Sequence, residues 1–279
     1  MTYKRRLKKS RLKLGLEFIG FVTCLMLFGW LWRSALESRW RGQGDFSYIE
    51  QQGDNLTART LIPEDSKLIT WKIPGNTLVE AGGGYGTYQW KNVFALGQID
   101  GQGGRVLTGT SREALGLAIS GWQVGRQTNL SWRDKLKIWY FVKFKTKQAL
   151  TIDLTQTPAW QEKTLSDGSR VWQIVEYQLD QIINQETFSQ EVAGENLSVS
   201  LVGGRSLSRV ISNHGIELVS VNNRIETSEQ TTIWVKEPTQ KDSLTVAWLK
   251  RLIPQAEVKI GAPEDFWSAI AIVLGKDYN

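Results

Sequence analysis

Residues 73–90 read I-P-G-N-T-L-V-E-A-G-G-G-Y-G-T-Y-Q-W, with four glycines between Gly82 and Gly86 directly after a short apolar run. Such a cluster is either a loop that cradles a phosphate or a turn between two strands. The P-loop pattern G-x-x-x-x-G-K-[ST] is absent, because Thr87 and Tyr88 follow the cluster. The G-x-G-x-x-G spacing also fails, and no acidic residue stands at the required distance after a βαβ unit. The cluster therefore indicates a turn.

Strands and helices are predicted on both sides of this turn. A strand at 67–73 ends at Pro74, and a second short strand precedes the glycines. Apolar spacing predicts helices at 88–99 and 105–116, followed by a strand at 118–124.

The segment 131–144, S-W-R-D-K-L-K-I-W-Y-F-V-K-F, begins with the N-cap residue Ser131 and predicts an amphipathic helix. Its apolar stripe consists of Leu136, Trp139, Tyr140 and Phe144. We expect this stripe to be buried in the core. The lysines and arginine of the segment keep a second interpretation open, in which the stripe lies on a membrane surface.

The second half of the chain predicts a hairpin with a turn at 166–169, a helix at 177–188 and a domain boundary at 191–195. Beyond the boundary, the order of strands and helices is βαββαββ. One helix ends at Gly215, and the other begins at Asp242 and stops at Pro254. This order predicts a small α/β sandwich with helices on one face of a sheet, so the fold class is α/β (α+β).

The charge of the chain is concentrated at its beginning. The formal net charge of +6 is matched by seven basic residues in the tail 1–13, which holds no acid. Residues 14–32 are almost entirely apolar and long enough to cross a bilayer as one helix. The rest of the chain is close to neutral, so a nucleic-acid partner is not expected. The positive-inside rule puts the tail in the cytoplasm and the rest outside. Trp30, Trp32 and Trp40 fit the outer aromatic belt.

The predicted organisation is a basic cytoplasmic tail (1–13), a transmembrane helix (14–32), a juxtamembrane stalk (33–66), an extracytoplasmic module (67–191) and a C-terminal domain (196–279). The predicted location is the cell membrane, with a single span. The competing interpretation of 14–32 is a cleaved signal peptide. The apolar run exceeds the usual signal length, and W-L-W-R-S follows in place of a cleavage site.

Cysteine and histidine are nearly absent. Cys24 is the single cysteine and lies in the apolar segment, so neither an intrachain disulfide nor a cysteine zinc site is expected. His214 is the single histidine, and any Ser-His-acid or histidine-metal chemistry would depend on it. A histidine at a helix end beside a glycine is more often a cap that complements the helix dipole. We predict no catalytic residue and no metal ligand.

The C-terminal segment 196–279 resembles the C-terminal domain of LytR/CpsA/Psr envelope proteins. The family pattern is a strand, a glycine turn, a helix ending in glycine, a strand and a closing V-x-L-G-x-D, and Leu274 to Tyr278 is the most specific match. The residues that carry the resemblance are Gly203, Gly204, Gly215, Gly275 and Asp277.

The opening stretch resembles a degenerate, shortened form of the catalytic module of the same family, whose signature is S-I-P-R-D-T. Here Pro74, Gly75, Asn76 and Thr77 occupy these positions, so glycine and asparagine replace the family's arginine and aspartate. The family transfers a glycopolymer from a polyprenyl pyrophosphate donor to peptidoglycan, chemistry that needs cationic clamps and Mg²⁺. The basic residues that could bind the anion in their place are Lys72, Lys91, Arg105, Arg112 and Arg126.

The resemblance leaves three hypotheses. The leading one is a membrane-anchored, non-catalytic binding module of the cell envelope, with peptidoglycan, a lipid-linked glycopolymer or envelope proteins as partners and no cofactor. The second is an active transferase of lipid-linked glycopolymer, which would require Mg²⁺ and the basic residues named above. The third is a structural scaffold without a ligand.

Overall fold

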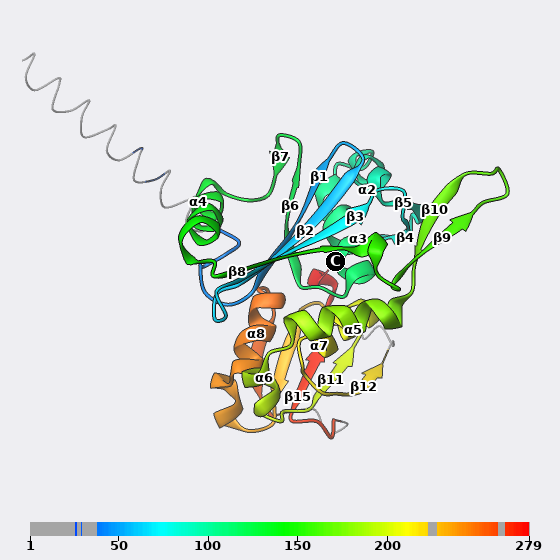
Figure 1. Ribbon diagram of the computed structural model, residues 1–279. Helices are drawn as coiled ribbons and strands as arrows, with labels where there is room; N and C mark the ends of the chain where they lie inside the picture. The colour runs from blue at the N-terminus through cyan, green and yellow to red at the C-terminus, as the bar shows by residue number, and fades with distance from the viewer. Residues whose placement is uncertain (1–25, 27–28, 30–37, 223–227, 262–265, 279) are drawn as a thin grey trace, which may run out of the picture.

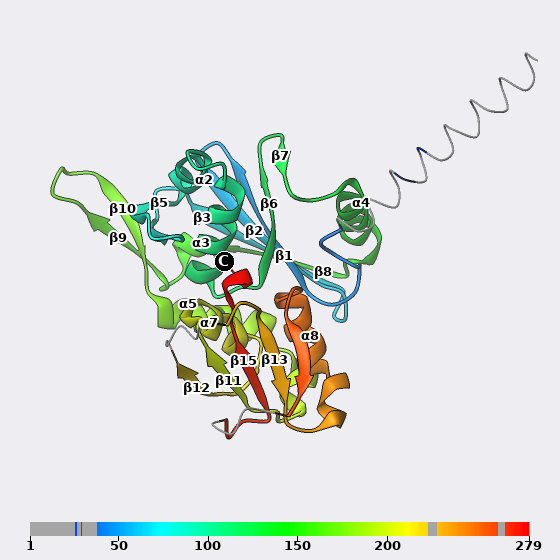
Figure 2. The ribbon, with the colours of Figure 1, turned by 180° about the vertical axis from the view of Figure 1, so that it is seen from behind.

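The computed structural model describes Met26, Gly29 and residues 38–222, 228–261 and 266–278. They form a mixed α/β protein with two halves, each with its own sheet and apolar core (Figure 1). Figure 2 shows from behind that the C-terminal end lies between the halves. The predicted span 14–32 lies outside the described residues apart from Met26 and Gly29. No helix within the described part of the chain is long and apolar enough to cross a membrane.

The first half is built on a six-stranded sheet with the order β7-β6-β1-β2-β3-β8. Strands β1, β2 and β3 form an antiparallel meander, β6 pairs parallel to β1, and β8 pairs parallel to β3. The bounds are β1 Phe46–Gln52, β2 Asn55–Ile62, β3 Lys67–Pro74, β6 Ile119–Val124, β7 Gln127–Thr128 and β8 Gln148–Asp153.

The prediction of a stalk over 33–66 is wrong, because β1 and β2 are central strands of this sheet. The polar residues of β1 and β2 interrupt the apolar pattern by which a strand is predicted from sequence. Ser47 donates a hydrogen bond to Thr60 Oγ1 at 3.0 Å, and Trp71 Nε1 donates to the same oxygen at 3.2 Å, so buried hydroxyls satisfy one another. Trp40, expected in a membrane belt, is buried against Phe46 with ring centroids 5.6 Å apart.

Helices α2 (Trp90–Gln98) and α3 (Gly103–Leu115) form as predicted and pack on the sheet, where Trp71 and Trp90 are fully buried in the largest core. The glycine cluster is a turn, as predicted, in the hairpin of β4 (Leu78–Ala81) and β5 (Gly86–Gln89). Gly83 and Gly84 have φ of +81° and +80°, a conformation that favours glycine in a tight turn.

Helix α4 (Trp132–Tyr140) continues into the π-helical turn η1 (Phe141–Lys145) and begins at Ser131, as predicted, with a capping box to Asp134. The prediction that its apolar stripe is buried is wrong. The helix buries its opposite face, Asp134 and Ile138, and Phe141 of η1 continues that face. Leu136, Trp139, Tyr140 and Phe144 are all exposed.

A short 3₁₀ turn, η2 (Leu154–Gln156), leads to the predicted hairpin of β9 (Trp160–Thr164) and β10 (Arg170–Ile174). Helix α5 (Glu176–Thr187), also predicted, and helix α6 (Gln190–Gly194) then join the two halves.

The C-terminal half has the predicted βαββαββ order, with the sheet order β12-β11-β15-β13-β14. Strands β11 and β15 are buried at every position, so both faces of the middle of the sheet are covered and not one face as expected. The bounds are β11 Val199–Val202, α7 Arg205–Asn213, β12 Leu218–Asn222, β13 Thr232–Val235, η3 Pro238–Asp242, α8 Leu244–Leu252, β14 Glu257–Ile260, β15 Ile270–Val273 and η4 Lys276–Tyr278.

Candidate functional site

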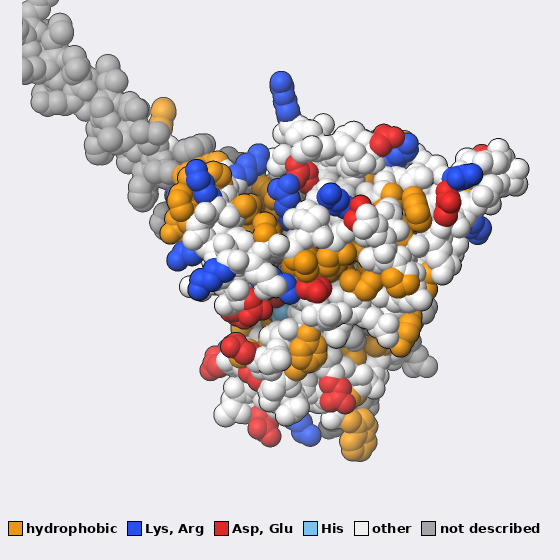
Figure 3. Space-filling model, viewed as in Figure 1, with side chains coloured by type: hydrophobic (Ala, Val, Ile, Leu, Met, Phe, Trp, Pro, Cys, Tyr) orange, Lys and Arg blue, Asp and Glu red, His pale blue; other side chains and the backbone are white. Residues whose placement is uncertain are grey.

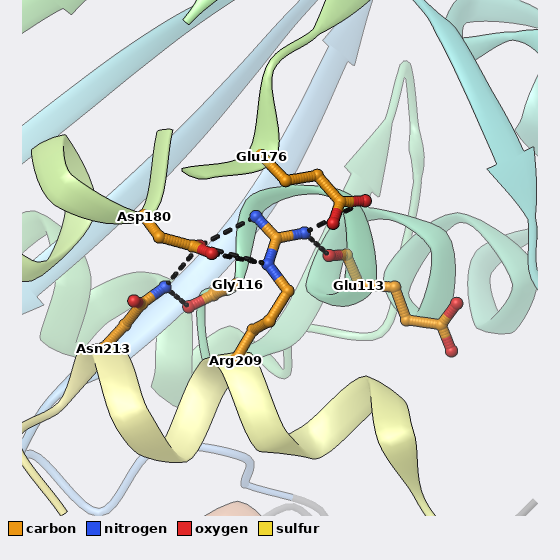
Figure 4. Close-up of polar contacts among 6 residues, drawn as sticks. All are labelled: Glu113, Gly116, Glu176, Asp180, Arg209 and Asn213. Carbon is orange, nitrogen blue, oxygen red and sulfur yellow. Dashed lines mark hydrogen bonds and ion pairs between the residues drawn. The ribbon is translucent and has the colours of Figure 1, made fainter. Parts of the chain in front are cut away.

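A polar hub centred on Arg209 of α7 holds the two halves together (Figure 4). The Arg209 guanidinium donates to both carboxylate oxygens of Asp180 on α5 at 2.8–3.1 Å, and to the carbonyl oxygen of Glu113 on α3 at 2.8 Å. Asn213 donates to Asp180 Oδ1 at 3.0 Å and to the carbonyl oxygen of Gly116 at 3.1 Å. The hub therefore fixes how the second half sits against α3 and α5.

A cleft of about 1160 Å³ opens between the two halves. Its walls come from the segment before β1, from the loop that leads to α4, from Arg112 of α3, and from α8 and the turn after it. The basic residues on these walls are Arg39, Arg41, Arg112, Lys250 and Arg251, and among the described residues only one acid, Asp45, lines the cleft with them.

The buried carboxylate of Asp134 positions the first wall. It accepts hydrogen bonds from Ser38 Oγ at 2.6 Å, from the backbone N–H of Arg39 and from that of Trp40, both at 3.1 Å. Burial opposes its ionisation, but these bonds together lower the pKa of Asp134. A permanent negative charge at α4 thereby fixes the backbone that carries Arg39 and Arg41.

Three of the basic side chains are available to a ligand. Arg112 is already used, because it donates to the carbonyl oxygen of Ile119 and to Tyr278 Oη, and Lys250 donates to the carbonyl oxygens of Pro254 and Ala256. Within the described part of the chain, no hydrogen bond or ion pair engages the side chains of Arg39, Arg41 and Arg251, all of which are exposed residues. Guanidinium groups in this state suit a phosphate or carboxylate.

The acid in the cleft, Asp45, is largely neutral in acidic solution. Burial raises the pKa of its carboxyl from 3.8 to about 7; Glu64 and Asp65 add to the rise, and Arg251 opposes it. Below pH 7 the cleft is therefore more positive than its residue types alone suggest.

His214 lies next to Asp45, with 3.6 Å between Nδ1 and Oδ2, and its ring stacks on Trp248 at 4.3 Å. Burial and the Arg251 cation lower the pKa of His214 to about 3, so the contact with Asp45 is not an ion pair at neutral pH. Its predicted place at the end of a helix is confirmed, since α7 ends at Asn213. The predicted charge on the helix dipole is wrong, because burial keeps the imidazole neutral.

The structure does not bring the five predicted anion-binding residues together. Lys72 is exposed on β3, Arg105 is exposed on α3, and Arg126 is exposed in the turn between β6 and β7. Lys91 is paired with Asp54 at 2.7 Å. Only Arg112 of the five lines the cleft.

The segment from Pro74 to Thr77 makes structural contacts. Thr77 Oγ1 donates to the carbonyl oxygen of Pro74 and accepts a hydrogen bond from Trp160 Nε1 at 3.0 Å, and Asn76 Nδ2 donates to the carbonyl oxygen of Arg170 at 3.1 Å. At Gly75, a Cβ atom would lie 1.7 Å from the carbonyl oxygen of Asp54. The backbone of the β1–β2 turn therefore occupies the space where a side chain at position 75 would begin.

The C-terminal positions also make structural contacts. Asp277 Oδ1 accepts hydrogen bonds from the backbone N–H of Thr231 at 2.7 Å and from its hydroxyl at 2.6 Å, beside Gly275, which leaves no room for a side chain against the backbone of residues 230–231. Gly203 and Gly204 meet Leu274 where β11 leads into α7, and Gly215 meets the ring of Phe188. These five residues therefore serve the packing of the second half.

Sequence reasoning missed Arg39, Arg41 and Arg251. The signals were present in R-W-R at 39–41 and K-R at 250–251. Residues 39–41 lay in the predicted stalk. Residues 250–251 lay on a predicted helix, and the sequence pattern does not show that this helix faces residues 39–41. No group of three or more His, Cys, Asp or Glu side chains in the described ranges is arranged to hold a metal ion.

No protein-family model matches the chain, and no curated protein matches it. Among solved structures, TagT from Bacillus subtilis is 12% identical with a TM-score of 0.42, over 51% of this chain and 89% of that chain. The LytR-CPS2A-psr family protein YwtF (TagT) with bound octaprenyl pyrophosphate lipid is 12% identical with a TM-score of 0.41, over 50% of this chain and 88% of that chain. A transcriptional regulator from Enterococcus faecalis is 11% identical with a TM-score of 0.42, over 62% and 89%. At this level of similarity the function has to be inferred from the residues of the chain itself.

Proposed function

We propose that the chain is a cell-envelope protein that binds an anionic, phosphate-bearing glycopolymer in the cleft between its halves, without transferring it. One observation carries this proposal. Among the described residues, the side chains of Arg39, Arg41 and Arg251 make no hydrogen bond or ion pair, and the single carboxylate that lines the cleft with them has a pKa raised to about 7. A polyanion is the ligand that such a set of charges favours.

The size of the cleft agrees with a polymer segment. At about 1160 Å³ it is larger than most pockets for single small molecules, which hold roughly 300–1,000 Å³. Arg39 and Arg41 lie on the segment before β1 and Arg251 lies on helix α8, so a chain of repeating phosphates can contact both elements.

Binding without transfer is supported by the positions where the resemblance would place the reacting groups. Gly75 has no charged side chain, and the Asn76 amide donates its hydrogen bond to the carbonyl oxygen of Arg170. Phosphoryl transfer depends on cations held against the developing charge. Lys72, Arg105 and Arg126 lie on β3, α3 and the turn between β6 and β7, and none of them lines the cleft.

The apolar segment 14–32 is proposed as the membrane anchor, which would put both halves on the outer side of the cell membrane. Peptidoglycan, a lipid-linked glycopolymer and other envelope proteins are then within reach as partners.

Replacing Arg39 and Arg251 by glutamine tests the cleft directly. With the full chain in detergent micelles and a glycerol-phosphate oligomer linked by phosphodiesters as the probe, we expect each change to weaken binding roughly tenfold, because each removes a charge-assisted hydrogen bond. Arg251→Lys should retain part of the affinity. Isothermal titration gives the dissociation constants.

The matched control is Arg170→Gln, because Arg170 is exposed on β10 and, among the described residues, its side chain pairs only with Glu162 at 3.6 Å. It should bind like the wild type. Equal losses in all three glutamine variants would mean that the oligomer binds to surface charge in general, and the cleft would lose its role.

The transferase hypothesis is tested in the same preparation with a polyprenyl-pyrophosphate-linked donor, Mg²⁺ and peptidoglycan. We expect no release of the polyprenyl carrier. Mg²⁺-dependent release that disappears in a Lys72→Gln, Arg105→Gln variant would establish transfer and overturn the binding proposal.

A further inference from the structure

The outer face of α4 and η1 carries a continuous set of exposed apolar side chains. The exposed fractions are 53% for Leu136, 52% for Trp139, 48% for Tyr140 and 58% for Phe144, and Val142 is exposed at 41%. Figure 3 shows hydrophobic and basic side chains gathered over the position of α4 in Figure 1. We call these five residues the aromatic face.

The aromatic face is a regular surface and not a frayed end. Leu136, Trp139 and Tyr140 follow helical spacing opposite to the buried Asp134 and Ile138. The rings contact one another, with centroid distances of 5.5 Å between Trp139 and Phe144 and 5.4 Å between Tyr140 and Phe144. The helix is thus held on one side by the buried Asp134 carboxylate and presents an ordered apolar surface on the other side.

The segment that carries the aromatic face is rich in basic residues. Residues 131–147 hold six lysines and arginines, of which Lys137 donates to Ser38 Oγ and to the carbonyl oxygen of Trp40, and their one acid, Asp134, is buried. Lys143 Nζ lies 5.5 Å from the ring centroid of Trp139 and 5.8 Å from that of Phe144. Aromatic rings beside lysines are the composition of a surface that enters the headgroup layer of an anionic bilayer.

The place of the aromatic face in the chain gives a second reason. The described chain continues from Ser38, whose hydroxyl is hydrogen-bonded to Asp134 of α4 itself. The apolar segment 14–32 ends six residues earlier, at Trp32. Six residue steps of extended chain reach at most about 20 Å, so a bilayer entered by 14–32 lies within reach of α4.

We propose that the aromatic face lies in the headgroup region of an anionic lipid bilayer and holds the first half of the protein against the membrane. Ser131, the N-cap of α4, also lines the cleft. Docking therefore brings one wall of the cleft close to the lipid surface, where a membrane-attached polymer would be presented.

Site-specific fluorescence tests this proposal with the full chain. Because Cys24 is the single cysteine, a Cys24→Ser background allows one probe position at a time. Phe144→Cys places an environment-sensitive fluorophore in the aromatic face, and Lys163→Cys places it on the exposed strand β9 as the matched control. The protein is reconstituted in vesicles of phosphatidylglycerol and phosphatidylcholine, with and without nitroxide-labelled lipid.

We expect the probe at position 144 to shift to the blue and to be quenched by the labelled lipid, while the probe at position 163 is unchanged. Changing Lys135 and Lys143 to glutamate should lower the docked fraction roughly tenfold, because each basic residue near an anionic surface contributes to binding. A probe at 144 that stays in water overturns the proposal. A blue shift that needs no lipid and grows with protein concentration also overturns it, because a second copy would then cover the face.

Discussion

Replacing Gly75 by arginine is expected to destabilise the protein by at least about 3 kcal/mol and not to restore a phosphate site. The reason is steric. A Cβ atom at this position would lie 1.7 Å from the carbonyl oxygen of Asp54 and 3.0 Å from Lys91 Cβ. The carbonyl oxygen belongs to the backbone of the β1–β2 turn and cannot swing aside as a side chain can. The free energy of unfolding, from chemical denaturation, measures the effect.

The matched control is Asn76→Asp, which introduces the carboxylate of the family pattern at the neighbouring position. It loses one hydrogen bond to the carbonyl oxygen of Arg170, so we expect a cost of about 1 kcal/mol. A Gly75→Arg variant as stable as Asn76→Asp would show that the β1–β2 turn can shift to make room for the side chain. The absence of the arginine would then be a simple substitution and not a consequence of the backbone path.

Replacing Arg209 by alanine is expected to cost about 2–3 kcal/mol and to loosen the junction of the two halves. Among the described residues, the change leaves Asn213 as the remaining hydrogen-bond donor to the Asp180 carboxylate, and it removes the hydrogen bond to the carbonyl oxygen of Glu113 near the end of α3. The side chain of Arg209 is 19% exposed, so water replaces part of the lost interaction. Calorimetry should show a lower Tm and a separate transition for the C-terminal half, which has its own core.

Arg170→Ala is the surface control, since the Arg170–Glu162 pair is open to solvent and should contribute less than about 0.5 kcal/mol. A double variant of Arg209 and Asp180 should cost less than the sum of the single changes, because both belong to one network. A single unshifted transition in Arg209→Ala would show that apolar contacts alone hold the halves.

The succession of elements was readable from the sequence wherever apolar spacing and a terminating residue agreed. The βαββαββ order of the C-terminal half and helices α2, α3 and α5 all appear where the pattern puts them. Strands β1 and β2 were missed because Ser47 and Thr60 look like surface residues and are in fact buried partners. No pattern within one strand reveals a hydrogen bond that the neighbouring strand completes.

The stripe of α4 shows a different limit. An amphipathic pattern reports that a helix has two faces, but it does not report which face the rest of the protein covers. Here the deciding residue is Asp134, whose carboxylate binds the backbone of residues 39–40 and draws the polar side of the helix inward. The cleft could not be predicted from the sequence either, because Arg39 and Arg41 lie about 210 residues before Arg251 in the chain.

The pH dependence of polyanion binding tests the central claim most directly, because the only acid among the described residues of the cleft titrates near neutrality. A pKa raised from 3.8 to about 7 leaves Asp45 neutral below pH 7 and negative above it. The phosphodiesters of the glycerol-phosphate oligomer do not titrate in this range, and the pKa of His214 is far below it. We therefore expect titrations at about pH 6 and about pH 8 to show binding roughly tenfold weaker at the higher pH in the wild type, and Asp45→Asn to remove that difference. Equal affinity at both values in the wild type, or a difference that persists in Asp45→Asn, would contradict the assignment of the cleft as the binding site.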